Sequence, residues 1–138
     1  MRILLDTCAV IDLTTDPDSL DKEVVALFND PENHIYISPE TERELVVQFN
    51  NKKLVSRFWD TAEEMLQAIE CEYEIEPLRL TVDTMHTYSR LRLNTAQDHR
   101  DPSDHVIISH AITEHITLLS SDGKFPFYRD QGLDLIEY

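Results

Sequence analysis

The chain has few of the residues from which several common sites are built. It contains only two glycines, Gly123 and Gly132, and two cysteines, Cys8 and Cys71. Neither a G-x-x-x-x-G-K-[ST] phosphate loop nor a G-x-S-x-G nucleophile elbow occurs. Two cysteines are too few for a disulfide framework, and no second cysteine pair is present for a structural zinc site. These absences exclude nucleotide-triphosphate cradles and hydrolase elbows, and they favour a reduced, cytoplasmic protein.

Long apolar runs and positive charge are also scarce. The apolar run before Asp6 is only Ile3-Leu4-Leu5, too short for a signal peptide or a membrane span. The 138 residues include 12 Lys and Arg against 27 Asp and Glu, for a formal net charge of −15. Because nucleic acids are polyanions, long-range attraction to RNA or DNA is not expected. Any activity on nucleic acid must therefore come from local charge and bound metal.

Apolar runs alternate with helical patterns, which predicts one α/β domain over residues 1–138 with a central, mostly parallel sheet. The expected strands are Ile3 to Asp6, His34 to Ile37, Cys71 to Ile75, Thr117 to Ser120 and Leu133 to Ile136. The expected helices run from Leu20 to Phe28, onward from Ser38-Pro39, from Leu54 to about Glu70, from Val82 to Arg92, and from Asp101 through Ile112. A turn-rich segment, Thr14 to Ser19, separates the first strand from the first of these helices.

Four carboxylates fall where such a fold places residues at the mouth of the sheet: Asp6, Glu44, Asp104 and Asp122. Asp6 ends the first expected strand and Asp122 follows a later one, and ligands bind at the carboxyl ends of parallel strands. Hard divalent cations such as Mg²⁺ and Mn²⁺ take oxygen ligands. Converged, these acids would hold such ions and cut phosphodiesters, because a bound metal lowers the pKa of water and neutralises the leaving oxygen.

Each of these acids also has a purely structural explanation. Glu44 alone would be an ordinary helix surface charge, Asp104 would favour the helix dipole, and Asp122 would be a turn residue. Asp101 is most simply the N-cap of the helix that carries Asp104. Asp6 is the hardest to explain in this way, because a carboxylate directly after an apolar strand is costly to bury unpaired.

The histidines and basic residues are less informative. The histidines show no H-E-x-x-H spacing, and we expect them to be solvated or packed rather than ligands: His34, His86, His99, His105, His110 and His115. The basic residues could contact phosphates or pair with neighbouring acids: Lys52, Lys53, Arg57, Arg90, Arg92 and Arg100.

The order and context of the four acids resemble those of the PIN-domain ribonucleases, and within them the toxins of VapBC-type toxin–antitoxin modules. Leu4-Leu5-Asp6-Thr7 is similar to the family's opening L-L-D-T, and Ile37-Ser38 followed by Glu44-Leu45 to its I-S-x5-E segment. Residues 99–104 read H-R-D-P-S-D and are similar to the H-R-D-P-x-D stretch. Residues 118–122 are similar to the final L-x-[ST]-x-D, so the resemblance spans nearly the whole chain.

The resemblance implies a PIN-like three-layer α/β/α fold and a metal-dependent endoribonuclease that is the toxin of a type II module. It implies that Asp6, Glu44, Asp104 and Asp122 are both the catalytic residues and the ligands of Mg²⁺, with Mn²⁺ as an alternative. Asp101 is then either an auxiliary member or, as its place before the helix favours, only a helix cap. It further implies an RNA substrate, a homodimer, and a small antitoxin whose C-terminal segment covers the site. A strongly negative surface would suit a basic partner peptide.

Four positions near the acids compare with the family pattern in different ways. Ser120 occupies the small hydroxyl position near the last acid, and Thr7 the hydroxyl after the first. His105 stands where many relatives carry Arg, and Gln48 where many carry Lys, which removes positive charge beside the expected site.

Two other functions remain as alternatives. One keeps the fold but makes the chain a non-toxic housekeeping nuclease or a nuclease-like RNA-binding module. The other is a phosphatase with Asp6 as nucleophile. That chemistry usually needs a second Asp two residues later, where this chain has Cys8.

Overall fold

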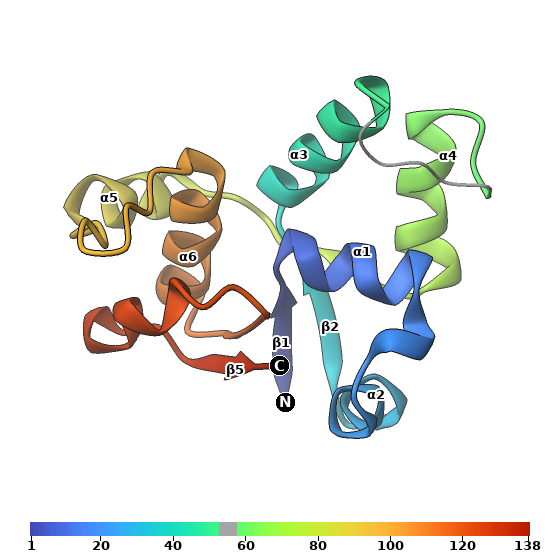
Figure 1. The fold of residues 1–138 in the computed structure, drawn as a ribbon, viewed down its shortest axis with the longest axis horizontal. Coiled ribbons are helices and arrows are strands. Elements are labelled where there is room, and N and C mark those ends of the chain that lie inside the picture. Colours follow the sequence, from blue (N-terminus) through green and yellow to red (C-terminus); the bar gives the residue numbers. More distant parts are fainter. Residues whose placement is uncertain (53–57) are drawn as a thin grey trace.

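A single parallel sheet forms the centre of the molecule in the computed structural model, which describes residues 1–52 and 58–138 (Figure 1). Its strand order is β3-β2-β1-β4-β5, and every neighbouring pair is parallel. The strands are β1 (Arg2–Leu5), β2 (His34–Ile37), β3 (Glu76–Pro77), β4 (Thr117–Ser120) and β5 (Leu135–Glu137). The central strand β1 is buried on both faces, as expected for a parallel sheet covered by helices.

Helices cover both faces of the sheet. They are α1 (Thr7–Thr15), α2 (Lys22–Asn29), α3 (Pro39–Asn50), α4 (Ala62–Gln67), α5 (Val82–Arg90) and α6 (Pro102–Glu114), with a π-helical turn η2 (Ala68–Glu72) and 3-10 segments η1 (Pro17–Ser19) and η3 (Phe125–Gln131). The predicted three-layer α/β/α arrangement is therefore confirmed. Two apolar cores result, because successive residues of a strand point to opposite faces.

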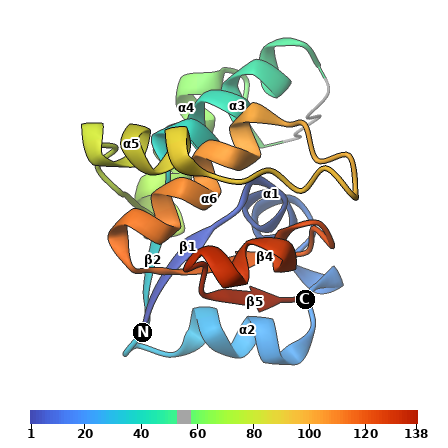
Figure 2. The ribbon, with the colours of Figure 1, turned by 90° about the vertical axis from the view of Figure 1, so that its left-hand side faces the viewer.

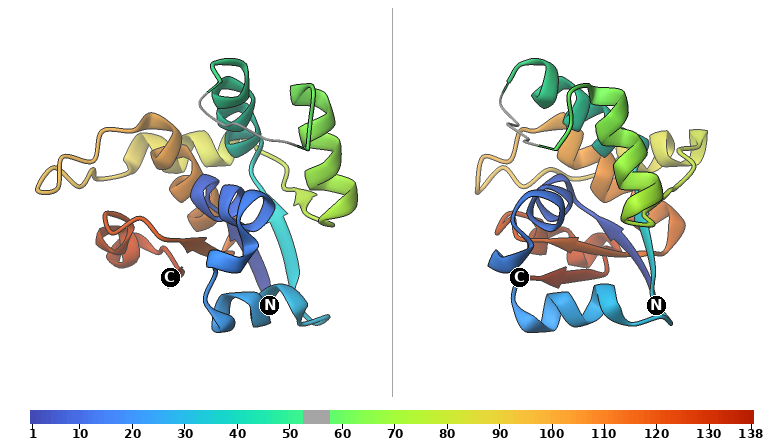
Figure 3. Two further views of the ribbon diagram at one scale, coloured as in Figure 1. Left: turned by 45° about the vertical axis from the view of Figure 1, so that its right-hand side comes forward. Right: turned by 90° about the vertical axis from the view of Figure 1, so that its right-hand side faces the viewer.

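One core lies under α1 to α4. Ile3 and Leu5 of β1 pack there with Val10, Leu45 and Met65 from the helices. Helices α3 and α4 pack against each other above it (Figure 3).

The other core lies under α6 and η3. Leu4, between Ile3 and Leu5, packs there with Ile107, Leu118 and Phe125. Helix α5 lies beside α6 on this side of the molecule (Figure 2). The alternation along β1 thus divides its side chains between the two layers of helices.

The helix starts that frame the candidate site were correctly predicted. Ser38 caps α3 by accepting a hydrogen bond from the Glu40 amide at 3.2 Å, and Pro39 follows it. Asp101 caps α6 in the same way, accepting from the Ser103 amide at 2.9 Å. These two caps fix where α3 and α6 begin, and so where Glu44 and Asp104 lie along them.

Helix α1 was not predicted, although it begins directly after Asp6. The Asp6 carboxylate accepts a hydrogen bond from the Thr7 amide at 2.7 Å and is the N-cap of this helix. Ala9 and Val10 of α1 are buried in the core. Packing on the sheet therefore fixes this helix despite its β-branched residues, which lower intrinsic helix propensity.

The expected strand from Cys71 to Ile75 was wrong. The backbone continues from α4 into η2, and the Tyr73 amide bonds to the Ala68 carbonyl at 3.1 Å. Ala68 and Ile69 remain buried in this turn, so packing against the core holds the helical conformation. The edge strand β3 forms later, at Glu76–Pro77.

The helix expected from Leu54 to Glu70 begins later than predicted. Residues 53–57 lie outside the described part of the chain, and in the described part the helix starts at Ala62 after the cap Thr61. Thr61 accepts from the Glu64 amide at 3.1 Å, while Glu64 reaches back to the Asp60 amide at 2.9 Å. This pair is similar to a capping box, except that Glu64 accepts from the residue before the cap, and it explains the late start.

Among the described residues, none of the helices is both long and apolar enough to cross a bilayer.

Candidate active site

The four carboxylates predicted from the sequence line one cleft. Asp6, Glu44, Asp104 and Asp122 all face an open cavity of about 410 Å³, together with Asp101. Asp6 directly follows β1 and Asp122 comes two residues after β4, so both lie at the carboxyl ends of neighbouring strands. Helices α3 and α6 bring the other acids to the same edge. Residues more than 100 positions apart in sequence therefore share a single site.

Ser120 joins the first and last acids. Its hydroxyl donates to Asp6 Oδ2 at 2.7 Å and accepts from the Asp122 amide at 3.1 Å. The Lys124 amide donates to Asp122 Oδ1 at 2.9 Å. Burial raises the pKa of Asp6, although hydrogen bonds from Ser120, Cys8 and Thr7 partly oppose this. Neutral donors thus orient both carboxylates without cancelling their charge.

Thr7 connects Glu44 to the start of α1. Its hydroxyl donates to Glu44 Oε2 at 2.5 Å, while its amide donates to Asp6. Burial is the main reason that the pKa of Glu44 is raised, and the charges of Asp101 and Asp6 raise it further. One residue therefore holds two of the four acids in place.

Asp104 is the most perturbed of the four. Its side chain is 15% exposed, and Nε2 of His99 lies 2.9 Å from its Oδ2. Burial raises the pKa of Asp104 to about 8, and the charges of Asp6, Asp101 and Glu44 add to the effect. A carboxyl whose charged form is this unfavourable in a cleft is typical of a functional site.

His99 is the residue that sequence reasoning underrated. We expected it to be solvated or packed, yet its ring contacts Asp104 and is also bonded to Tyr128. Burial lowers the pKa of His99, so the neutral ring is favoured. One ligand atom each from His99, Asp104 and Asp122 lie within 4.8 Å of one another. The signal available in the sequence was its place at the start of the H-R-D-P-S-D stretch.

The donor set fits a hard divalent cation. The charged side chains in the described lining of the cleft are all acidic, and they lie close enough to raise one another's pKa values. Carboxylate oxygens are the ligands that Mg²⁺ and Mn²⁺ prefer. A bound cation would offset the mutual repulsion, and Asp6, Glu44, Asp104 and Asp122 are the residues that would hold it.

The other residues singled out in the sequence take different places. Gln48 lines the cleft, as expected for its position one turn after Glu44. His105 is buried behind the cleft against His99, with ring centroids 4.7 Å apart, and its Nε2 has no hydrogen-bond partner in the described structure. Asp101 lines the cleft while its Oδ1 caps α6. The half-buried Cys8 thiol, whose pKa is raised mainly by burial, donates to Asp6 Oδ2 at 3.2 Å.

Two of the basic residues pair with nearby acids. Arg92 contacts Asp130 at 2.8 Å, and Arg100 contacts Asp98 at 2.5 Å. These pairs agree with the expectation that the basic residues pair with neighbouring acids. Lys53 and Arg57 lie outside the described residues.

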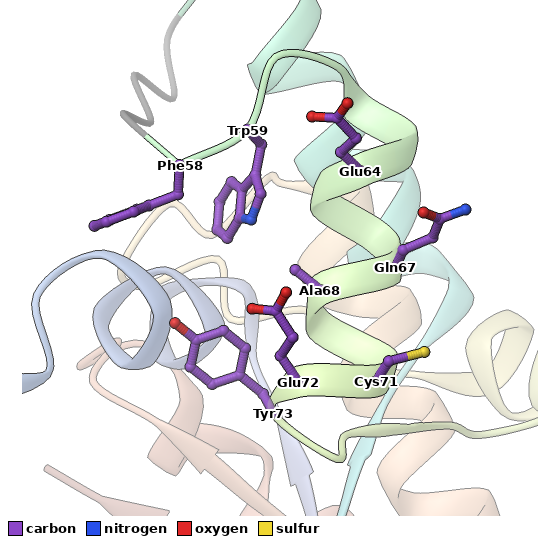
Figure 4. A pocket seen from close by; sticks show the side chains of 8 residues that line it. All are labelled: Phe58, Trp59, Glu64, Gln67, Ala68, Cys71, Glu72 and Tyr73. Atoms are coloured by element: carbon purple, nitrogen blue, oxygen red, sulfur yellow. The ribbon is translucent and has the colours of Figure 1, made fainter.

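A second cavity, of about 770 Å³, shares no lining residue with the acidic cleft. Its walls come from the segment before α4, from α4, from η2 and from Tyr73 directly after η2 (Figure 4). The lining residues are Phe58, Trp59, Glu64, Gln67, Ala68, Cys71, Glu72 and Tyr73. We refer to this cavity as the aromatic groove.

Comparisons with known proteins agree with the fold. The chain is similar to VapBC2 from Rickettsia felis, in a structure bound to a promoter DNA fragment, with a TM-score of 0.70 and 25% identity over 99% of this chain and 98% of that one. It is also similar to VapBC-1 from nontypeable Haemophilus influenzae, with a TM-score of 0.69 and 20% identity over 99% and 98% of the two chains. A third similar structure is VapBC-5 from Mycobacterium tuberculosis, with a TM-score of 0.63 and 20% identity over the same shares of the chains.

A comparison with curated proteins found no match. The family comparison matches the PIN domain over residues 3–130, a range that contains all four acids of the cleft. The chain therefore belongs to the PIN-domain family.

Proposed function

We propose that this chain is a divalent-metal-dependent endoribonuclease and the toxin of a type II toxin–antitoxin module. The observation that carries the proposal is the convergence of Asp6, Glu44, Asp104 and Asp122 in one cleft at the carboxyl ends of β1 and β4. Membership of the PIN-domain family supports the nuclease activity. Similarity to chains of VapBC complexes supports the toxin role.

In this mechanism the protein supplies a fixed set of carboxylates and no covalent nucleophile. Thr7 and Ser120 orient Asp6 and Glu44, and the Lys124 amide orients Asp122. Mg²⁺ or Mn²⁺ bound by the four acids would lower the pKa of water and neutralise charge on the leaving oxygen of the RNA. Because the acids are pre-oriented, little reorganisation would accompany binding of the cation.

Asp6→Asn tests the nuclease proposal directly. The amide has the size of the carboxylate and keeps one oxygen, which can still accept from the Thr7 amide or from the Ser120 hydroxyl, but it removes one charge from the cleft. We expect cleavage of RNA by this variant to fall to the level of the wild-type protein in EDTA. Asp18→Asn, an exposed acid outside the cleft, is the matched control and should cleave like the wild type. Undiminished cleavage by Asp6→Asn, or by the wild type in EDTA, would show that the mechanism is wrong.

The toxin role has its own test. We expect induced expression of the wild-type chain to arrest growth and expression of Asp6→Asn to be harmless. Sequencing the 5′ ends of cellular RNA after induction would then identify the RNA that is cut. Harmless expression of an active wild-type enzyme would instead favour a housekeeping nuclease.

We further propose that a small antitoxin occupies the aromatic groove with a basic amphipathic helix. The groove presents aromatic rings together with the carboxylates of Glu64 and Glu72, and the chain carries a net charge of −15. The aromatic walls would contact the apolar face of such a helix, and the acidic rim would attract its basic side chains. The Tyr73 ring is oriented here by a bond to the Thr14 carbonyl of α1 at 3.4 Å.

A charge reversal separates partner binding from catalysis. Glu72→Lys should weaken binding of the co-purified antitoxin while leaving RNA cleavage by the free protein unchanged. Glu23→Lys, an exposed acid on α2, is the control with the same change of charge. If Glu72→Lys and Glu23→Lys bind the antitoxin with equal affinity, the antitoxin does not bind in the aromatic groove.

The proposal includes a homodimer, which follows from the family resemblance, and a cytoplasmic location, which agrees with the two free cysteines. Light scattering of the purified chain would test the dimer.

A further inference from the structure

A chain of hydrogen bonds runs behind the acidic cleft and ends on Asp104. The Asn94 amide donates to the Tyr128 hydroxyl oxygen at 3.1 Å, and the same oxygen lies 2.9 Å from His99 Nδ1. The other ring nitrogen, Nε2, lies 2.9 Å from Asp104 Oδ2. His99 is 3% exposed and Tyr128 is fully buried, so neither side chain is free to turn to water.

The hydrogen bonds favour one arrangement of the protons in this network. The Asn94 amide can only donate, so the Tyr128 oxygen accepts there and its own proton is available for His99 Nδ1. When Nδ1 accepts a hydrogen bond from the Tyr128 hydroxyl, the single proton of the neutral ring is on Nε2. His99 Nε2–H then donates to Asp104 Oδ2, so Tyr128 and both ring nitrogens of His99 have hydrogen-bond partners.

The same kind of support recurs at the other acids. Asp6 is held by Ser120, Glu44 by Thr7, and Asp122 by the Lys124 amide, each through a neutral donor. Asp104 obtains its neutral donor from His99. The described hydrogen bonds of Asp104's side chain use Oδ2, so Oδ1 is the oxygen left for a cation.

We infer that His99 is a positioning residue, which with Tyr128 fixes the orientation in which Asp104 meets the divalent cation. The inference rests on the proposed function, since it concerns how one acid of the site is presented. Partners of this kind behind metal ligands commonly change metal affinity by about 10- to 100-fold when they are removed. A direct ligand role for His99 would require an unprotonated Nε2, which the Tyr128 bond disfavours.

Two substitutions of His99 separate these roles. Gln can place an amide N–H near the position of Nε2 and keep the donor to Asp104, whereas Leu cannot donate. Measured by calorimetric titration of the full chain with Mn²⁺, His99→Leu should bind about 10- to 100-fold more weakly than the wild type. His99→Gln should bind close to the wild type. Tyr128→Phe, which keeps the ring and removes the hydroxyl, should also weaken Mn²⁺ binding.

His110→Leu is the matched control. His110 is also buried on α6 with both ring nitrogens bonded, to Ser38 Oγ at 2.9 Å and to the Arg79 carbonyl at 3.1 Å, but it does not line the cleft. Its loss should lower the melting temperature without changing Mn²⁺ affinity. If His99→Gln binds as weakly as His99→Leu, His99 is a ligand and the inference is wrong. If Tyr128→Phe and His99→Leu both bind like the wild type, the network serves packing only, and the inference is likewise wrong.

The titration also distinguishes this inference from the proposed function. A wild-type protein that binds Mn²⁺ but cuts no RNA would contradict the proposed function, while the comparison of His99 variants would still stand. A wild-type protein that binds no Mn²⁺ would overturn the inference about His99 itself.

Discussion

Replacing Asp104 by Asn should stabilise the metal-free protein while abolishing its activity. The wild-type carboxyl is destabilised by burial and by its acidic neighbours, which raise its pKa from 3.8 to about 8. An amide of the same size removes the charge and can still accept the hydrogen bond from His99 Nε2. Asp104 is therefore expected to lower the stability of the fold, as strained active-site groups commonly do.

The magnitude follows from linkage between proton binding and folding. At pH 7 the unfolded chain has lost this proton while the folded chain retains it, which corresponds to at most about 4 kcal/mol of lost stability. Asp104 is 15% exposed and interacts with several titrating neighbours, so we expect the realised difference to be about 1–3 kcal/mol. For a chain of 138 residues this corresponds to a rise in Tm of about 4–10 °C.

The sign of the pH dependence is specific. Because the folded pKa lies above the unfolded one, the wild type has its full stability below about pH 4 and loses this contribution as the pH rises to about 8. The advantage of Asp104→Asn in EDTA should thus be small at pH 5 and largest at pH 8. Adding Mn²⁺ should raise the Tm of the wild type more than that of the variant, because the cation binds only the folded state.

Urea unfolding followed by circular dichroism at pH 5, 6, 7 and 8 provides the measurement. Asp83→Asn, an exposed acid on α5, controls for the change in net charge. Equal or lower stability of Asp104→Asn at pH 8, or a difference that does not grow with pH, would refute the reasoning.

Two smaller predictions concern single positions away from the cleft. Burial and the Glu70 carboxyl raise the pKa of Glu42 to about 7. Glu42→Gln should therefore stabilise the protein by about 1 kcal/mol at pH 8, after allowance for solvent screening at the exposed Glu70, and by little at pH 4. An equal gain in stability at both pH values, measured by urea unfolding, would exclude this cause. Gly132 has a φ of +102°, so Gly132→Ala should lower the stability by about 1 kcal/mol. The Cβ of Gly123→Ala would meet nothing within 4 Å, so the stability of this variant should stay within about 0.5 kcal/mol of the wild type. Equal melting temperatures for the two alanine variants would contradict this prediction.

Local signals in the sequence were sufficient for part of the fold. The second strand was predicted with the bounds His34–Ile37, because apolar alternation there is followed at once by Ser38-Pro39, which both caps and starts a helix. Asp101 was predicted as a cap for the same reason. In each case the determining interactions lie within a few residues of one another, so they can be read from neighbouring residues.

Other elements depend on packing that local patterns do not contain. Thr7–Thr15 is helical because Ala9 and Val10 reach the core, although its threonines, valine and isoleucine are poor helix formers. The segment from Cys71 to Ile75 was expected to be a short strand, but burial of Ala68 and Ile69 continues the helix into η2. The signal at Thr61 was present as T-x-x-E and would have corrected the helix start.

The acids of the site could be named from the sequence, whereas their supports could not. Motif order and strand context pointed to Asp6, Glu44, Asp104 and Asp122, but the partner of His99 is Tyr128, which lies 29 residues away on η3. The bond of Ser120 to Asp6 spans 114 residues. Contacts of this length depend on the completed fold, because only the sheet and its covering helices bring the two groups together.

The supporting bonds also explain why the cleft would need a positive group from outside. A neutral donor fixes each acid, so its geometry is set without a compensating positive charge, and the pKa values of Asp6, Glu44 and Asp104 stay raised. A divalent cation would relieve this repulsion, and so would a basic side chain of a bound partner. A cation and such a side chain would occupy the same cleft, so a basic partner segment that covers the cleft should compete with Mn²⁺. Without either, the acids should repel the phosphates of RNA, and we expect the enzyme to be silent.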